Sequence, residues 1–499
     1  MNRGRGNIMG APARSQAAVR AATKTFWPKP LEYPAPYGPI FLLFLGYVLF
    51  FYLQGGYRFE FLGRIRFELI AGVLLLIGSL LTLSAPRTKS RYPRSNIIGW
   101  VYAMVAMAGV MTVLSYSTAI SWPVFLDRVV KFSTMTLFIG ALVTTPDRLR
   151  WFLGAYLLAF LKMAQEGVLG LITGSLVWQN QGTMRLHGAT PNYAHPNSFS
   201  GTQLVTLPFL RFLAPLAPKY LQWVLIAQAV GAIFVVVTTG SRTGYVALAL
   251  WLFFLWAQSN AKFKSIFLSA IAAFAILPFI PTDYINRFET IFTQKDEEGA
   301  SIDMRKEILR DAWAILAEYP LGVGVGAFSP VRQKKFGRTQ HTHNLYLEVA
   351  CDMGIQGLAV FLGFVLAMIT SARRTSAQAD RQMAQLPAQA RAPPSDEHSA
   401  AIESHRADLK LIKATAQAVL SFLVIRLGLG LFGHDFYEIY WWFAAGLLIA
   451  LHRMLGKAEE RTQFLASTAA AAPETAGSDS AGAAANGASK PARAAGRAP

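Results

Sequence analysis

The chain contains a single cysteine, Cys351, so it can form neither an intramolecular disulfide nor a cysteine-based metal site. It is also poor in charge: 15% of its residues are charged, and 28 acidic residues stand against 47 basic ones. Soluble proteins carry about 25% charged residues and have shorter apolar segments. The N-terminal stretch 1–37 has no apolar core before a cleavage site, so no signal peptide is predicted.

Long apolar runs recur along almost the whole sequence, in which 53% of the residues are hydrophobic. About 20 apolar residues are enough for a helix to cross a bilayer, and continuous rather than alternating runs favour helices over a β-barrel. The sequence therefore predicts an all-α polytopic membrane protein with about 12 transmembrane helices. The predicted spans are 38–55, 67–85, 97–117, 124–144, 151–173, 196–214, 220–239, 245–257, 264–281, 345–371, 414–431 and 437–455.

The formal net charge of +19 does not indicate nucleic acid, because the basic residues lie in short loops between apolar spans. This pattern fits anionic membrane lipids as partners and the positive-inside rule. It predicts cytoplasmic even-numbered connections and places both termini in the cytoplasm. The odd-numbered connections 174–195, 240–244, 282–343 and 432–436 then share the opposite face, and they hold the most unusual polar residues.

The predicted organisation has two low-complexity tails and two blocks of transmembrane helices separated by a long loop. The segments are a cytoplasmic basic tail, 1–37; transmembrane helices 1–9, 38–281; a loop with an amphipathic helix, 282–343; transmembrane helices 10–12, 344–455; and a disordered cytoplasmic tail, 456–499. Inside the second block, 373–413 is rich in Ala, Gln, Arg and Pro, and we expect a flexible cytoplasmic linker that is partly helical towards its end.

Two arginines stand out on the predicted outer face. Arg185 lies in loop 174–195, and Arg242 lies in the turn TTGSRTG between two apolar spans. A charge at that position is costly unless it snorkels to the interface, pairs or serves a site. Each arginine is either an interfacial anchor for lipid phosphate or part of a site, and the Gly240 and Gly244 bracket favours a site for Arg242.

A helical pattern follows in the long loop. Apolar residues recur at helical spacing from Asp303 to about Glu318, which predicts an amphipathic helix on the membrane surface. Arg305 sits at its start, where a cation gains nothing from the helix dipole, and this favours a ligand role. Arg310 is predicted on the solvated face. The following PLGVGVG run predicts a close-packed turn and lacks the spacing of a nucleotide loop.

His341 and His343 end this loop directly before an apolar span. A His-x-His pair raises zinc as a possibility, but no third ligand with suitable spacing is present in sequence. An imidazole with an ordinary pKa of about 6.5 is a more direct candidate for a general base. Glu348, one turn into the span, either orients an imidazole or serves as a structural cap.

In the last outer turn, His434, Asp435 and Glu438 lie among aromatic residues. Asp435 is expected to polarise a histidine or to counter an arginine charge, with a solvated turn as the alternative. Three arginines and a histidine on one face indicate phosphate chemistry, because guanidinium groups bind phosphate oxygens in a bidentate manner. The arginines could neutralise a diphosphate leaving group where other enzymes use a divalent metal, so no cofactor and no metal are predicted.

Four motifs resemble those of O-antigen ligases and the related O-antigen polymerases and pilin O-oligosaccharyltransferases. They are RLHGATPNYAHPNSF, TTGSRTGY, DMRKEILRDAW with YPLGVGVGAF, and HTHNLYLEVACDMGIQGL. Each motif alone is loose, but their order and spacing before the last spans make the resemblance specific. It covers about 38–455 and leaves both tails unexplained.

The resemblance implies a GT-C-like, inverting and metal-independent glycosyltransferase of the bacterial inner membrane with a periplasmic active site. Its donor would be an undecaprenyl-diphosphate-linked glycan and its acceptor a lipid A–core hydroxyl. The roles implied are Arg185, Arg242 and Arg305 on the diphosphate and His343 as the base, since His343 directly precedes the Asn of the family pattern. The additional His341 leaves the identity of the base open. A polymerase is the nearest alternative, and a transporter of lipid-linked sugars is a more distant one.

Overall fold

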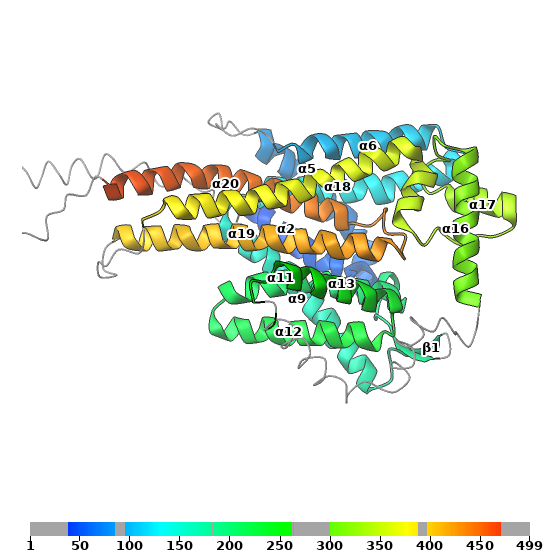
Figure 1. Cartoon of the computed structure of the whole chain (residues 1–499), viewed down its shortest axis with the longest axis horizontal. Helices are drawn as coiled ribbons and strands as arrows, with labels where there is room; N and C mark the ends of the chain where they lie inside the picture. The colour runs from blue at the N-terminus through cyan, green and yellow to red at the C-terminus, as the bar shows by residue number, and fades with distance from the viewer. Residues whose placement is uncertain are drawn as a thin grey trace, which may run out of the picture.

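The computed structural model describes residues 38–84, 95–180, 183–261, 263, 300–387 and 397–470. Most helices run along the long axis of the molecule, and a smaller helical unit lies across one end of this bundle (Figure 1). The predicted tail 1–37, the predicted span 264–281 and the first part of the predicted loop, 282–299, lie outside the described residues.

The first part of the chain forms apolar helices that pack through aromatic side chains. These helices are α2 (Pro39–Tyr52), α3 (Gly55–Arg58), α4 (Glu60–Arg64), α5 (Phe67–Ser84), α6 (Ile97–Val113) and α9 (Pro146–Ile172). Phe44 of α2 stacks on Phe152 of α9 with ring centroids 5.5 Å apart. Arg58 pairs with Glu166 at 2.6 Å and joins α3 to α9. These contacts bring helices that are distant in sequence into one core.

Two predicted spans are interrupted in the structure. The predicted span 124–144 begins at the last residue of α7 (Thr118–Val124) and contains a π-helical turn, η1 (Phe125–Val130), and α8 (Lys131–Leu142). The predicted span 196–214 divides into α10 (Pro196–Leu204) and α11 (Leu207–Leu213), followed by a 3-10 turn, η3 (Ala214–Leu216). The division after α10 has a local cause, because Pro208 has no N–H to donate to the carbonyl four residues earlier.

The predicted loop 174–195 contains a β-hairpin that the sequence patterns do not predict. Strands β1 (Val177–Asn180) and β2 (Thr183–Leu186) pair antiparallel, with Trp178 opposite Arg185. The short 3-10 helix η2 (Pro191–Tyr193) then leads to α10. The hairpin is followed in the chain by α12 (Lys219–Thr238) and α13 (Arg242–Gln258), whose connecting turn carries the TTGSR sequence.

The amphipathic helix predicted for the long loop is present as α16 (Ala300–Glu318), and α17 (Phe328–Phe336) follows it. The helix begins at Ala300, so Arg305 lies in its second turn rather than its first. Its buried face carries Ile308, Ala312 and Ile315, while Trp313 is 61% exposed. The apolar side of α16 therefore packs against protein, in a small core shared with α17 and the start of the next helix.

That next helix, α18 (Leu345–Gln385), is broken at Gly354, whose φ of 74° no helix accommodates. The break leaves backbone carbonyls without helical partners. The carbonyl oxygen of Cys351 accepts from the N–H of Val323 at 2.9 Å, and that of Asp352 accepts from the N–H of Gly324 at 2.9 Å. The glycine run is thus the close-packed turn that the sequence predicts, and it docks into the break of α18.

The Asp352 carboxylate completes this junction. It is buried and accepts the N–H of Phe328 at 3.0 Å, which lies in the first turn of α17, and the N–H of Gly326 at 2.9 Å. Tyr437 donates its hydroxyl to the same carboxylate at 2.6 Å. One acidic side chain therefore joins the glycine run, α17 and the last loop of the protein.

The C-terminal helices are longer than the sequence predicts. Helices α18, α19 (Glu397–Gly430) and α20 (Tyr440–Ala470) pack together and extend beyond the rest of the bundle (Figure 1). The predicted flexible linker 373–413 is wrong over 373–385, which is helical, while the helix expected towards its end is present. The predicted disordered tail 456–499 is helical as far as Ala470, because Leu465 and Thr462 are buried.

The structure confirms an all-α membrane protein, with the single short hairpin as an addition among the described residues. Within the residues that the structure describes, five helices are long and apolar enough to cross a membrane. Their apolar stretches are Phe67–Ser84, Pro146–Ile172, Lys219–Thr238, Leu345–Gln385 and Ser399–Gly430. The total of about 12 spanning helices stays a prediction.

Candidate active site

The two histidines of the HTHN sequence flank a buried threonine. The Thr342 hydroxyl donates to the carbonyl of Asn344 at 3.0 Å, and the Asn344 side chain accepts the N–H groups of Tyr346 and Leu347 at 3.0 and 3.1 Å. Asn344 thereby caps α18. His343 adopts the left-handed conformation with φ of 48°. A non-glycine residue in this region is uncommon and often marks a functional constraint.

A third histidine completes a cluster at this point. The ring of His434, from the loop between α19 and α20, stacks on His341 with centroids 4.9 Å apart and planes 8° apart. It meets the ring of His343 edge to face at 5.3 Å. His434 appears in sequence only as a neighbour of Asp435, and the signal that could identify it is its place in an odd-numbered connection.

The environment holds His343 in its neutral form. Burial, and then the charges of His434, Arg305, His341 and His195, lower the pKa of His343 from 6.5 to about 4. Burial also lowers the pKa of His341 and of His195, and Arg185 contributes to the second shift. The imidazole of His343 is therefore unprotonated near neutral pH and can accept a proton.

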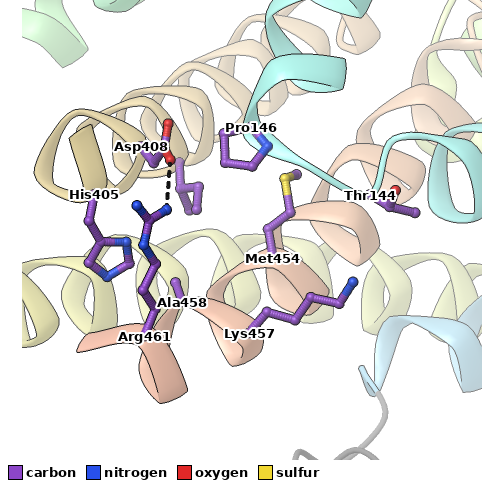
Figure 2. A pocket seen from close by; sticks show the side chains of 9 residues that line it. Thr144, Pro146, His405, Asp408, Met454, Lys457, Ala458 and Arg461 are labelled. Atoms are coloured by element: carbon purple, nitrogen blue, oxygen red, sulfur yellow. Dashed lines mark ion pairs between the residues drawn. The ribbon is translucent and has the colours of Figure 1, made fainter. Parts of the chain in front are cut away.

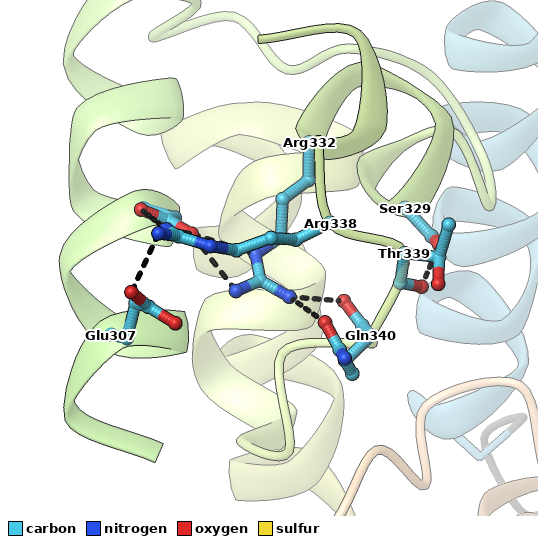
Figure 3. A network of polar contacts seen from close by, with 7 residues as sticks. Glu307, Ser329, Arg332, Arg338, Thr339 and Gln340 are labelled. Atoms are coloured by element: carbon cyan, nitrogen blue, oxygen red, sulfur yellow. Dashed lines mark hydrogen bonds and ion pairs between the residues drawn. The ribbon is translucent and has the colours of Figure 1, made fainter. Parts of the chain in front are cut away.

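Helix α16, which carries Arg305, packs against α17 through a network of polar contacts (Figure 3). Arg332 of α17 is completely buried and donates Nε to the Asp311 carboxylate of α16 at 2.9 Å. Its Nη1 donates to the side-chain oxygen of Gln340 at 2.7 Å, and Arg338 pairs with Glu307 at 2.6 Å. This network fixes α16 to the segment that directly precedes His341.

Arg185 and the Arg242 turn are also connected. Arg185 is buried, and its Nε donates to the carbonyl of Thr239 at 2.8 Å, three residues before Arg242. Its Nη2 donates to the side-chain oxygen of Asn197 at 2.7 Å. The Ser241 hydroxyl accepts the N–H of Gly244 at 3.1 Å and caps α13, so Arg242 lies in the first turn of that helix. Arg185 therefore joins the hairpin, the Arg242 turn and the start of α10.

The two acidic residues predicted to support the site have structural partners. Glu348 is buried and accepts the backbone N–H of Phe436 at 3.2 Å, a contact of the structural kind. Asp435 pairs with Arg426 at 2.5 Å. Asp435 thus counters an arginine charge, as one of the sequence interpretations expects, although that arginine was not among the predicted site residues.

Arg426 is the residue that sequence reasoning missed. It lies in α19, inside the predicted span 414–431, and only 2% of its side chain is exposed. Its guanidinium carbon lies 3.7 Å from the centroid of the Tyr440 ring. The signal was available in the sequence, because a lone arginine within an apolar run is costly in a membrane and is rarely without a role.

A separate polar pocket lies at the other end of α19 (Figure 2). It is lined by Thr144, Pro146, His405, Asp408, Ile412, Met454, Lys457, Ala458 and Arg461. Asp408 and Arg426 belong to the same helix and are roughly 27 Å apart at about 1.5 Å per residue. None of the predicted site residues lines this pocket, so it is distinct from the histidine cluster.

The arrangement of the three histidines bears on metal binding. Within the described residues, no group of three or more His, Cys, Asp or Glu side chains is arranged to hold a metal ion. The three clustered histidines are related instead by ring packing, with two parallel planes and one crossed plane. The arrangement offers the neutral imidazole of His343. The guanidinium of Arg305 is one of the charges that lower the pKa of this imidazole.

The helical architecture and this site define a class: a multi-pass membrane protein with a polar arginine–histidine site at one end of its helical bundle. Residues 227–362 match the protein-family model described as O-Antigen ligase, and this match supports an O-antigen ligase family assignment. The matched segment contains Arg242, Arg305, His341, His343 and Glu348. Comparison with the curated proteins finds no match.

The family assignment indicates glycosyl transfer of the O-antigen ligase or polymerase type in lipopolysaccharide biosynthesis. It also indicates lipid-linked glycan substrates and contact with membrane lipids. The segment outside the match contributes Arg185, His434, Asp435 and Arg426, which the structure joins to the matched part.

We expect the kcat/KM of the enzyme to be retained at acidic pH. Because the pKa of His343 is lowered to about 4, kcat/KM should stay level as pH falls through 6.5 and should decline only below about pH 5. The same shift means that the unfolded state binds a proton more readily, so His343 contributes stability above pH 6.5 that is lost as pH falls towards 4. Initial-rate measurements between pH 4.5 and 8 test this. A decline centred near 6.5 would contradict a buried neutral imidazole.

Proposed function

We propose that the protein is an O-antigen ligase that transfers a glycan from undecaprenyl diphosphate to a sugar hydroxyl of lipid A–core. The reaction would take place at the periplasmic face of the bacterial inner membrane, with both chain termini in the cytoplasm. The observation that carries the proposal is the neutral His343 imidazole within electrostatic reach of Arg305. This arrangement combines a proton acceptor with a phosphate-binding cation.

In the proposed reaction, His343 takes the proton of the acceptor hydroxyl while the oxygen of that hydroxyl attacks the anomeric carbon of the glycan. The bond between that carbon and the diphosphate oxygen breaks, and the configuration inverts. Undecaprenyl diphosphate leaves with the electron pair of the broken bond. The bound diphosphate would also raise the pKa of His343 from its free-enzyme value, because nearby negative charge favours the imidazolium. The base would thereby gain proton affinity only when the donor is bound.

The arginines have two different parts in this proposal. Arg242 and Arg305 would bind the diphosphate oxygens directly and stabilise the charge that develops on the leaving group. Arg185 would act mainly by supporting the segments around the diphosphate, because at least two of its donor nitrogens are already bonded to Thr239 and Asn197. Its charge would still contribute to the positive field, as its effect on His195 indicates.

The proposal is tested by a transfer assay with purified protein in detergent. The donor is undecaprenyl-diphosphate-linked glycan, the acceptor is purified lipid A–core, and EDTA is present throughout. We expect lipid A–core to shift to a glycan-bearing form on a gel, and we expect chelation to have no effect. Longer glycans on the lipid carrier, with lipid A–core unchanged, would identify a polymerase. Activity that is lost in EDTA and restored by a divalent ion would refute the metal-independent mechanism.

A further inference from the structure

The position of His434 depends on the loop between α19 and α20. This loop carries His434 between the rings of His341 and His343. It is tied to the protein by the Phe436 N–H on Glu348 and by the Tyr437 hydroxyl on Asp352. Both of these contacts are made to α18. A further contact, between Asp435 and Arg426, is the one that ties the residue next to His434 to α19.

The Arg426–Asp435 contact is unusual for its burial. The Arg426 side chain is 2% exposed and that of Asp435 is 26% exposed, and the two are 2.5 Å apart. A guanidinium buried among apolar helices requires a counter-charge, since an unpaired buried charge costs several kcal/mol. Asp435 is therefore held close to Arg426, and this restricts the backbone at His434. The carbonyl of Asp435 also accepts Trp441 Nε1 at 3.0 Å, which fixes the other side of the residue.

Arg426 also contacts the elements that carry the other site residues. Its guanidinium lies over the ring of Tyr440, whose hydroxyl lies 3.5 Å from that of Thr202 in α10. A Cβ at Gly201, in the same helix, would lie 3.8 Å from Nη1 of Arg426. Helix α10 begins directly after His195, and its Asn197 binds Arg185. Arg426 thus lies where α10, α19 and the His434 loop meet.

We propose that Arg426 is a positioning residue whose ion pair with Asp435 holds His434 against His341 and His343, and so fixes the environment of the catalytic base. Its consequence for catalysis rests on the proposed function. The groups that act electrostatically on His343 are His434, Arg305, His341 and His195, and the group that acts on His434 besides its own burial is Asp435. Loss of the pair would let His434 leave the cluster and would expose His343 to water.

The test measures the protonation of His343 without any substrate. Diethyl pyrocarbonate modifies neutral imidazoles, and peptide mass spectrometry reports the modification of each histidine between pH 4.5 and 7.5. In the wild-type protein, His343 should remain reactive towards the low end of this range. In Arg426→Met and in Asp435→Asn, we expect its half-maximal reactivity to move upward by roughly one pH unit or more, towards the value of an exposed histidine. Arg426→Lys keeps the charge and should retain most of the wild-type profile.

Arg148→Met is the matched control. Arg148 is also a buried arginine, 5% exposed, with its guanidinium 5.0 Å from the ring of Phe41, but it lies at the end of the bundle that holds the second pocket. Its replacement removes the same chemical group and should leave the His343 profile unchanged. Size-exclusion elution verifies that each variant is folded, and Asp435→Asn carries the test if Arg426→Met does not purify.

An unchanged pH profile of His343 labelling in Arg426→Met would overturn the positioning role. If Asp435→Asn is the only folded variant of the two, an unchanged profile in that variant has the same meaning. An equal shift of the profile in Arg148→Met would also overturn the role. The labelling outcome is separate from the proposed function. A shifted profile in a protein that transfers no glycan to lipid A–core would support the positioning role and refute the ligase assignment.

Discussion

His343→Ala is expected to lower glycan transfer by about 10²–10⁴-fold, the range that a general base contributes. The cause is the loss of the only imidazole in the cluster that combines a left-handed backbone conformation with a pKa lowered to about 4. The measurement is the initial rate of lipid A–core modification by purified protein. Donor binding should change little, because the arginines that bind the diphosphate remain.

His341→Ala separates the two histidines of the sequence. His341 stacks on His434 and supports the cluster, so its loss should lower the rate by less than the loss of His343. An identical loss in both variants would mean that the cluster acts as a unit, and a larger loss in His341→Ala would reverse the assignment of the base. Thermal unfolding of each variant distinguishes lost chemistry from lost structure.

Arg305→Ala and Arg242→Ala are each expected to lower transfer by about 10²–10³-fold, the loss that follows removal of one group stabilising a developing anion. Lysine at either position should restore part of the rate, because it keeps the charge but loses the bidentate geometry. The comparison is made at saturating donor, so that weaker binding and slower chemistry can be separated.

Arg310→Ala is the control for Arg305, since Arg310 lies on the same helix, is exposed and carries the same charge. Its removal changes the net charge of α16 equally but should leave transfer nearly unchanged. If Arg310→Ala and Arg305→Ala were equally impaired, the arginines would act through the general positive field of the loop. Near-normal transfer by Arg305→Ala would remove this residue from the site.

Much of the architecture is predictable because membrane helices can be recognised in a sequence by the length and hydropathy of their apolar runs. The division after Leu204 is less visible in the sequence, since it depends on one proline, Pro208, within an otherwise continuous apolar run. The extension of α20 to Ala470 was hidden by an alanine-rich composition that reads as disorder but is also compatible with a helix. Packing against α19 favours the helix over disorder, and such packing cannot be predicted from local composition.

The site shows the same division. Arg185, Arg242, Arg305 and His343 can be proposed from the sequence because charged or titratable residues between apolar spans are costly and rare. The partners of Glu348 and Asp435 are not identifiable in this way, because Phe436 lies 88 residues from Glu348 and Arg426 lies nine residues from Asp435. An acidic side chain near an imidazole in sequence can turn to a backbone amide or a guanidinium instead, and only the tertiary structure selects between them.

The separate core of α16 and α17 has a consequence for how this chain can diversify. Most of its apolar residues pack among themselves and against the first turns of α18, while Val325 belongs to the core of the bundle. The unit meets α18 through backbone hydrogen bonds at the Gly354 break, through the buried Asp352 carboxylate and through the side chains of Leu347 and Cys351. An exchange of residues 304–343 between relatives would therefore preserve this junction only if the new segment kept the backbone N–H groups that bond the Asp352 carboxylate.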